Sequence, residues 1–197
     1  MLDNKVWIAL EGIDGSGKDT QLEMLYHKVT NDTCFTREPG ASQIGWDIRE
    51  IALLDNTPAL TRHLCMVASR VADMRHMNKL RPKYIIANRS IVSGLVYDEE
   101  FTDLNLKATK GRLPDLVIFL GVKETEIKDR LPSTDPIERK SVEYHLKIQN
   151  KFMTVMSERN IPHVILYGGS IQSTHESIVE ILTDYYPEVL LTTPTSS

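Results

Sequence analysis

The chain has 197 residues, of which 41% are hydrophobic and 25% charged, so it is long enough for one domain with a sizeable core. A formal net charge of −4 excludes a strongly basic nucleic-acid-binding surface. Two cysteines without metal-ligand spacing exclude a disulfide framework. The N-terminus lacks the pattern of a signal peptide, and no apolar run approaches the roughly 20 residues that span a bilayer. We therefore expect a cytoplasmic protein with no nucleic-acid or membrane partner.

Short apolar runs that favour β-strands alternate with helical patterns along the chain. The expected strands are at 6–11, 33–36, 84–87, 116–120 and 163–167. The expected helices are at 17–29, 43–54, 59–79, 89–98, 123–131, 138–159 and 173–185. This alternation predicts an α/β fold with a parallel sheet, whose ligand lies beyond the carboxyl ends of the strands. We expect one domain over residues 1–197, with a flexible tail at 188–197.

The turn after the first expected strand matches the phosphate-binding loop G-x-x-x-x-G-K, with Gly12, Gly17 and Lys18 at the defining positions. Glycines let backbone N–H groups close around phosphate oxygens, the following helix directs its positive end at the same anion, and Lys18 adds a charge. The motif therefore predicts a nucleotide-phosphate site. Its candidate residues are Gly12, Gly15, Ser16, Gly17, Lys18, Asp19 and Thr20.

Asp19 departs from this motif, because the position after the lysine is usually Ser or Thr, whose hydroxyl ligates Mg²⁺. A carboxylate is also a good ligand for Mg²⁺. Two interpretations stay open. Either Asp19 holds the metal, directly or through water, or it points away and Thr20 contributes the hydroxyl.

An apolar stripe runs along the helix expected at 59–79. We interpret it most simply as core, although part of it fits a dimer interface as well. Its members are Leu60, Leu64, Val67, Ala68, Val71 and Met74.

Two arginines follow the second and third expected strands. Pro39 favours an extended backbone at Glu38, so the segment after the second strand is a loop that presents Arg37 at the sheet edge. Arg89 stands where its planar guanidinium can bind a phosphate with two hydrogen bonds. At helical spacing, Ser93 and Tyr97 would lie on the same face as Arg89. A solvated turn, an arginine capped by local carbonyls and a tyrosine in the core are the alternatives.

Four segments resemble those of thymidylate kinases in order and spacing: 10–18 around the phosphate loop, 36–40 (Thr-Arg-Glu-Pro-Gly), 88–97 (Asn-Arg-Ser…Ser…Tyr) and 113–116 (Leu-Pro-Asp-Leu). The resemblance implies the fold of P-loop nucleoside monophosphate kinases, with a five-stranded parallel sheet flanked by helices and a short lid at about 130–140. It also implies a homodimer that transfers the γ-phosphoryl group of ATP to dTMP with Mg²⁺.

The resemblance assigns roles to individual residues. The phosphate loop would bind ATP, and Lys18, Asn88, Arg89 and the lid residue Arg139 would be catalytic. Arg37 and Arg89 would hold the acceptor phosphate, Asp14 would lie near the sugar 3′-hydroxyl, Arg70 would contact the thymine, and Tyr97 would lie under the deoxyribose. The substrate-binding set is Asp14, Arg37, Glu38, Pro39, Met66, Arg70, Arg89, Ser93 and Tyr97.

Several positions depart from the family pattern. Asn88 replaces an aspartate near the metal, and together with Asp19 it forms a hypothetical compensating pair. Pro136 stands where the lid often carries arginine, so Arg139 is the nearest substitute and Arg130 the next. Met66 replaces a phenylalanine that stacks on thymine, which makes dUMP or a 5-substituted dUMP a candidate acceptor. The alternatives are a deoxynucleoside kinase and a non-catalytic nucleotide-binding homologue.

Overall fold

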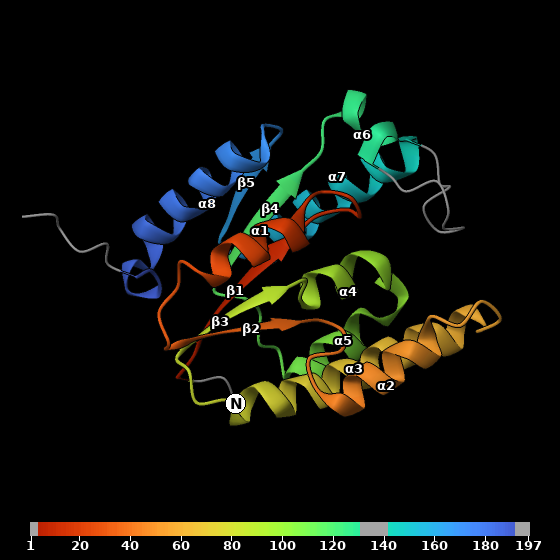
Figure 1. Ribbon diagram of the computed structural model, residues 1–197. Helices are drawn as coiled ribbons and strands as arrows, with labels where there is room; N and C mark the ends of the chain where they lie inside the picture. Colours follow the sequence, from red (N-terminus) through yellow and green to blue (C-terminus); the bar gives the residue numbers. More distant parts are fainter. Residues whose placement is uncertain (1–3, 131–141, 192–197) are drawn as a thin grey trace, which may run out of the picture.

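The protein is built around a five-stranded parallel sheet (Figure 1), seen in a computed structural model that describes residues 4–130 and 142–191. The strands are β1 (Val6–Glu11), β2 (Thr33–Arg37), β3 (Tyr84–Asn88), β4 (Leu116–Gly121) and β5 (His163–Tyr167). Their order in the sheet is β2-β3-β1-β4-β5, and every pairing is parallel. This confirms the α/β fold class predicted from the alternation of strand and helix patterns.

Helices cover both faces of the sheet. They are α1 (Lys18–Tyr26), α2 (Gln43–Ala52), α3 (Ala59–Lys79), α4 (Ile91–Tyr97), α5 (Thr102–Thr109), α6 (Glu124–Arg130), α7 (Val142–Glu158) and α8 (Ile171–Tyr185), with short 3₁₀ helices η1 (Glu99–Phe101) and η2 (Pro187–Val189). No helix within the described residues is both long and apolar enough to cross a lipid bilayer.

Alternate residues of the central strand β1 face opposite layers, as the two-residue period of a strand requires. Ile8 and Leu10 pack in one cluster with Leu25 of α1 and residues of α8. Trp7 and Ala9 point to the other face, which α3, α4 and α7 cover. A strand buried on both faces is nearly all apolar, which explains the continuous run that identified it.

The register of the sheet brings three strand ends together. Leu10 of β1 is opposite Asn88 of β3, and Asn88 is opposite Arg37 of β2. The loops that follow these strands therefore start at one edge of the sheet, where an α/β fold binds its ligand.

The apolar stripe of α3 is not core, and this expectation is wrong. Leu60, Leu64 and Val71 are 60%, 44% and 52% exposed, and Met74 is the one member of the stripe that is buried. The reason is that the inward side of α3 carries buried polar residues, including Arg70 and Asp73. These bind the loop after β2 and turn the apolar side outward.

Other differences concern short elements and the chain end. Helix α5 and the two 3₁₀ helices lie outside the expected elements. The prediction of a flexible tail from residue 188 does not hold for 188–191, because η2 precedes a bridge between Leu190 and Val29. The remaining tail and most of the proposed lid, 131–140, lie outside the described residues.

Candidate functional site

The phosphate loop lies between β1 and α1, and the structure explains why two of its positions are glycine. Gly12 has a φ of +150°, and a Cβ there would lie 2.5 Å from the Leu120 carbonyl oxygen of β4. Gly17, at the start of α1, has a left-handed φ of +93°, which side chains rarely adopt. Strand β4 and the backbone of the loop itself therefore require glycine at the two motif positions.

Lys18 is buried inside this loop, with 5% of its surface exposed. Its Nζ donates hydrogen bonds to the carbonyl oxygens of Gly12 (3.0 Å) and Ile13 (2.8 Å) and to Oγ of Ser16 (3.2 Å). Burial, followed by the positive charge of Arg89, lowers the pKa of Lys18 to about 7. An incoming phosphate can replace these neutral acceptors and stabilise the charged amine.

Arg89 is held in an unusual backbone conformation directly after β3. Its φ is +66°, a left-handed value that costs about 1–3 kcal/mol for a residue with a side chain. Its Nη1 donates to Oγ of Ser93 (2.9 Å), and its Nη2 donates to Oδ1 of Asp14 (2.5 Å). The guanidinium carbon lies 5.7 Å from the centre of the Tyr97 ring. The predicted grouping of Arg89 with Ser93 and Tyr97 is thus present in the structure, and Asp14 joins it.

The same contacts set the protonation of the acidic partners of Arg89. Burial alone would raise the pKa of Asp14, but the charges of Arg89 and Lys18 outweigh it and hold that pKa below its usual range. Burial raises the pKa of Tyr97 to about 12. At neutral pH the site therefore holds an ionised Asp14 and a neutral phenol.

Glu11, which the motif analysis did not assign a role, orients the start of α4. Its carboxylate is fully buried and accepts hydrogen bonds from the backbone N–H and hydroxyl of Ser90, both at 2.7 Å. It also accepts from the N–H (3.2 Å) and hydroxyl (2.7 Å) of Ser93. The signal in the sequence was a charged residue ending an otherwise apolar strand, because a buried charge needs partners.

The compensating pair proposed from the sequence is in direct contact. Nδ2 of Asn88 donates to Oδ1 of Asp19 at 2.7 Å, and Nη2 of Arg37 lies 3.6 Å from the same oxygen. The side chain of Asp19 is 75% exposed at the rim of the loop. Asp19 therefore points toward the ends of β2 and β3, and Thr20 is exposed beside it.

Arg70 lies beneath the loop that follows β2. It is 2% exposed, donates from Nε to Oε1 of Glu38 and from Nη1 to Oδ1 of Asn105. A Cβ on Gly94 would lie 2.7 Å from both terminal nitrogens, so glycine there makes room for the guanidinium. Burial raises the pKa of Glu38 to about 7 even with Arg70 against it. Asn105 is a site-supporting residue that the sequence did not reveal.

The remaining candidates surround this core of the site. Pro39 follows Glu38 through a cis peptide bond, and Met66 lies one helical turn before Arg70 on α3. Arg139 lies outside the described residues. Arg130 ends α6, and a Cβ on Gly15 would lie 2.4 Å from its carbonyl oxygen, so the end of α6 lies against the phosphate loop.

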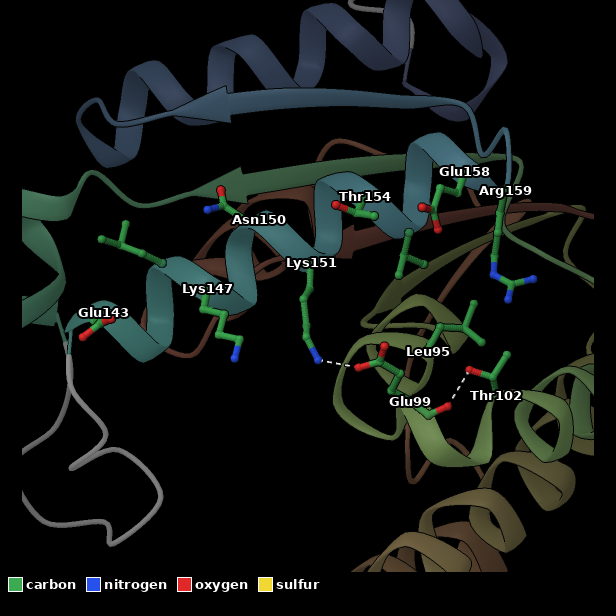
Figure 2. Close-up of a pocket in the computed structure, with 12 residues that line it drawn as sticks. Leu95, Glu99, Thr102, Glu143, Lys147, Asn150, Lys151, Thr154, Glu158 and Arg159 are labelled. Atoms are coloured by element: carbon green, nitrogen blue, oxygen red, sulfur yellow. Dashed lines mark hydrogen bonds and ion pairs between the residues drawn. The ribbon is translucent and has the colours of Figure 1, made fainter.

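A separate groove of about 580 Å³ lies between α4, η1 and α5 on one side and α7 on the other (Figure 2). Lys151 and Glu99 bridge it with an ion pair of 2.6 Å. Its lining contains three acidic and three basic side chains and none of the candidate residues. Because these charges balance, the groove offers no net positive charge to a phosphate.

Comparisons with known proteins identify the family of this chain. A family model described as thymidylate kinase matches residues 10–178. The thymidylate kinase of Nautilia profundicola is 32% identical over 190 residues, covering 91% of this chain and 98% of that protein. The thymidylate kinase of Helicobacter pylori is 37% identical over 188 residues, covering 90% and 98%.

Solved structures show the same fold. The thymidylate kinase of Candida albicans aligns with a TM-score of 0.74 and 22% identity, covering 96% of both chains. The thymidylate kinase of Ehrlichia chaffeensis aligns with a TM-score of 0.68 and 20% identity, covering 91% of this chain and 99% of that one. With the family model spanning most of the sequence, the chain belongs to the thymidylate kinase family of nucleoside monophosphate kinases.

Proposed function

We propose that this protein transfers the γ-phosphoryl group of ATP to dTMP and produces dTDP and ADP. The observation that carries the proposal is the convergence of two cationic groups at one sheet edge. Lys18 lies in the loop after β1, and Arg89 follows the neighbouring strand β3, with Asp14 interacting with both. Bringing two anionic nucleotides together requires positive charge from more than one loop.

On the acceptor side, Arg89 and Arg37 would hold the phosphate of dTMP, and Asp14 would accept a hydrogen bond from the sugar 3′-hydroxyl. The ring of Tyr97, fixed beside Arg89, would lie under the deoxyribose. Arg70 and Met66 share one side of α3 and would face the base. The family resemblance supplies these roles, and the contacts between Arg89, Asp14, Ser93 and Tyr97 are consistent with them.

The residues present fit a Mg²⁺ ion held mainly by nucleotide phosphates. The described residues contain no cluster of three or more His, Cys, Asp or Glu side chains that could hold a metal alone. Asp19 offers one exposed carboxylate at the rim, and Mg²⁺ in phosphate-transfer sites commonly takes one or two carboxylates and several waters. Asp19 would hold the ion, which neutralises charge on the β- and γ-phosphates when bound.

In the transfer step, an oxygen of the dTMP phosphate attacks the γ-phosphorus, and the bond from that phosphorus to the bridging oxygen of ADP breaks. Lys18 would stabilise the negative charge on the phosphates, while Arg89 would hold the attacking group in line. No described residue needs to form a covalent intermediate. An arginine of the lid, Arg139 or Arg130, would add charge when the lid closes.

The test is ATP turnover measured against dTMP, dUMP, a 5-substituted dUMP and thymidine, with ADP release as the readout. We expect dTMP to give the highest kcat/KM. A preference for dUMP would correct the base, and turnover of thymidine alone would indicate a deoxynucleoside kinase. Tight nucleotide binding without ADP release would indicate a protein that only binds nucleotides.

We further propose a homodimer formed by the outer side of α2 and α3, which lie side by side (Figure 1). Large apolar side chains on these helices and on the turn between them are exposed: Ile44, Ile51, Leu53, Leu54, Leu60, Leu64 and Val71. A patch of this kind marks an interaction surface. Light scattering after size exclusion should give a dimer for the native chain and a monomer for Leu64→Asp. Leu191→Asp, at an exposed leucine beside η2, is the control that should stay dimeric.

A further inference from the structure

A buried carboxylate on α3 binds the loop that follows β2. Asp73 is fully buried, and its Oδ2 accepts a hydrogen bond from the Gly40 N–H at 2.7 Å. Its Oδ1 accepts from the N–H and the hydroxyl of Ser42, both at 2.8 Å. Within residues 4–130 and 142–191 Asp73 makes no ion pair, and three of its four hydrogen-bond donors belong to this loop, the fourth being the Ser69 hydroxyl of α3 at 3.4 Å. Hydrogen bonds to an ionised acceptor are about twice as strong as neutral ones.

Asp73 is one of two attachments between this loop and α3. The Glu38 N–H donates to the Asn88 carbonyl oxygen (2.9 Å), which continues the pairing of β2 with β3. The side chain of Glu38 then accepts from Arg70, and two residues further on Gly40 donates to Asp73. Arg70 and Asp73 are three residues apart on one side of α3. The loop that follows Arg37, the last residue of β2, is therefore fixed to one helix at Glu38 and again at Gly40.

The first turn of α2 is shaped around the same carboxylate. A Cβ on Gly45 would lie 2.0 Å from Oδ1 of Asp73, so only glycine fits. Ser42 caps α2 by accepting a hydrogen bond from the Gly45 N–H (2.9 Å) while its hydroxyl donates to Asp73. Ser69, one turn before Asp73, donates to the Gly45 carbonyl oxygen at 2.8 Å. Asp73 thus sets both where the loop ends and where α2 begins.

We propose that Asp73 is a positioning residue for the acceptor nucleotide: by fixing the loop that follows β2, it holds the end of that strand, and with it Arg37, at the distance from Arg89 that the acceptor phosphate requires. This inference rests on the proposed function. Asp73 does not touch the substrate, because it is fully buried behind the loop. It acts through the position of Arg37, whose strand partner Asn88 directly precedes Arg89.

Replacing Asp73 with asparagine is the most specific test of these hydrogen bonds. The two backbone donors bind different carboxylate oxygens, and an amide has only one acceptor oxygen. Asp73→Asn therefore leaves one buried N–H without an acceptor and places an amide donor against it. Because such a loss is large for a buried group, we expect the KM for dTMP to rise roughly 10- to 100-fold. The KM for ATP should change by less than about threefold, since the phosphate loop makes no contact with Asp73.

Two further variants provide a milder change at the same contact and a control. Ser42→Ala removes one of three loop donors and should raise the KM for dTMP in the same direction by less than about tenfold, even if Asp73→Asn fails to fold. Asp103→Asn removes an exposed carboxylate on α5 and should change neither KM. Equal increases in both KM values, or an unchanged KM for dTMP in folded Asp73→Asn, would overturn the proposal.

Amide hydrogen exchange separates this inference from the proposed function. In Asp73→Asn the Gly40 and Ser42 amides should exchange at least about tenfold faster, while amides of the phosphate loop keep their native rates. If the native chain does not phosphorylate dTMP, the proposed function fails, but exchange still measures whether Asp73 holds the loop. Unchanged exchange at both amides would show that it does not, whatever the substrate.

Discussion

The two halves of the proposed site, a donor half for ATP and an acceptor half for dTMP, are constructed in different ways. The donor half is the loop between β1 and α1, where left-handed glycines shape the main chain and Lys18 bonds to carbonyl oxygens five and six residues away. The acceptor half depends on buried carboxylates that reach across the fold. Glu11 binds Ser90, 79 residues away, and Asp73 binds Gly40, 33 residues away.

This difference determines how each half should respond to mutation. The backbone of the phosphate loop sets the shape of that loop. Replacing the Lys18 side chain therefore removes a charge and leaves the shape unchanged. An acceptor site held by distant carboxylates loses its arrangement when one contact is lost. Substitutions in the acceptor half should therefore change the affinity for dTMP more than the affinity for ATP, and substitutions in the two halves should have different kinetic effects.

The largest effect should come from Lys18→Ala. Removing the one buried cation of the phosphate loop takes away a group that stabilises charge in the transition state, so kcat should fall about 10²- to 10³-fold. Steady-state kinetics with saturating ATP and dTMP measures the loss, and melting temperature checks that the fold persists. Activity close to that of the native chain would remove Lys18 from the proposed role.

The next largest effect should come from Arg89→Ala, which probes the other half. Hydrogen bonds to a charged group contribute about 1.5–3 kcal/mol, so the apparent affinity for dTMP should fall roughly 10- to 100-fold. The apparent affinity for ATP should fall much less. Arg81→Ala, which removes an exposed arginine before β3, is the matched control and should leave the affinity for dTMP unchanged. An equal loss for both nucleotides in Arg89→Ala would contradict a role specific to the acceptor.

The same difference explains what the sequence could predict. The phosphate loop was recognisable because its glycines and lysine stand at fixed spacings that backbone sterics demand. The strands were recognisable because a parallel sheet buried on both faces leaves continuous apolar runs. The grouping of Arg89 with Ser93 and Tyr97 followed from helical spacing, and the structure contains these contacts.

The sequence could not predict the features that depend on contacts between residues distant along the chain. Nothing local marks Asp73 or Asn105 as partners of a distant loop, since each is an ordinary polar residue on a helix. The apolar stripe of α3 was assigned to the core because periodicity identifies an apolar side without saying what covers it. Here the buried side is the polar one, and Leu60 and Leu64 are exposed.

A smaller effect should appear at the contact where the two halves meet. Asp19 belongs to the donor loop and Asn88 to the strand before Arg89, and their side chains are 2.7 Å apart. A cycle of Asp19→Ser, Asn88→Asp and the double variant should show coupling of about 0.5–1 kcal/mol in kcat/KM, since exposed pairs fall at the low end of such values. Strictly additive effects would mean that the pair does not compensate.

The smallest effect should be a proton taken up when a nucleotide binds beside Lys18. Burial, and then Arg89, lower the pKa of this amine to about 7, so it is mostly neutral in the empty protein at pH 8. The phosphates of ATP favour the charged amine and raise its pKa. Binding at pH 8 should therefore take up between about half a proton and one proton, and affinity should weaken as the pH rises above 7.

Calorimetric titration of ATP in buffers with different ionisation enthalpies measures this uptake. Lys18→Arg is the control, because its guanidinium stays charged throughout and should take up no proton at this position. Uptake that persists in Lys18→Arg would assign the proton to another group. Stability of the empty protein should show the opposite dependence on pH. Between about 7 and 10.5 the unfolded chain binds more protons at position 18, so its contribution to the free energy of unfolding increases with pH.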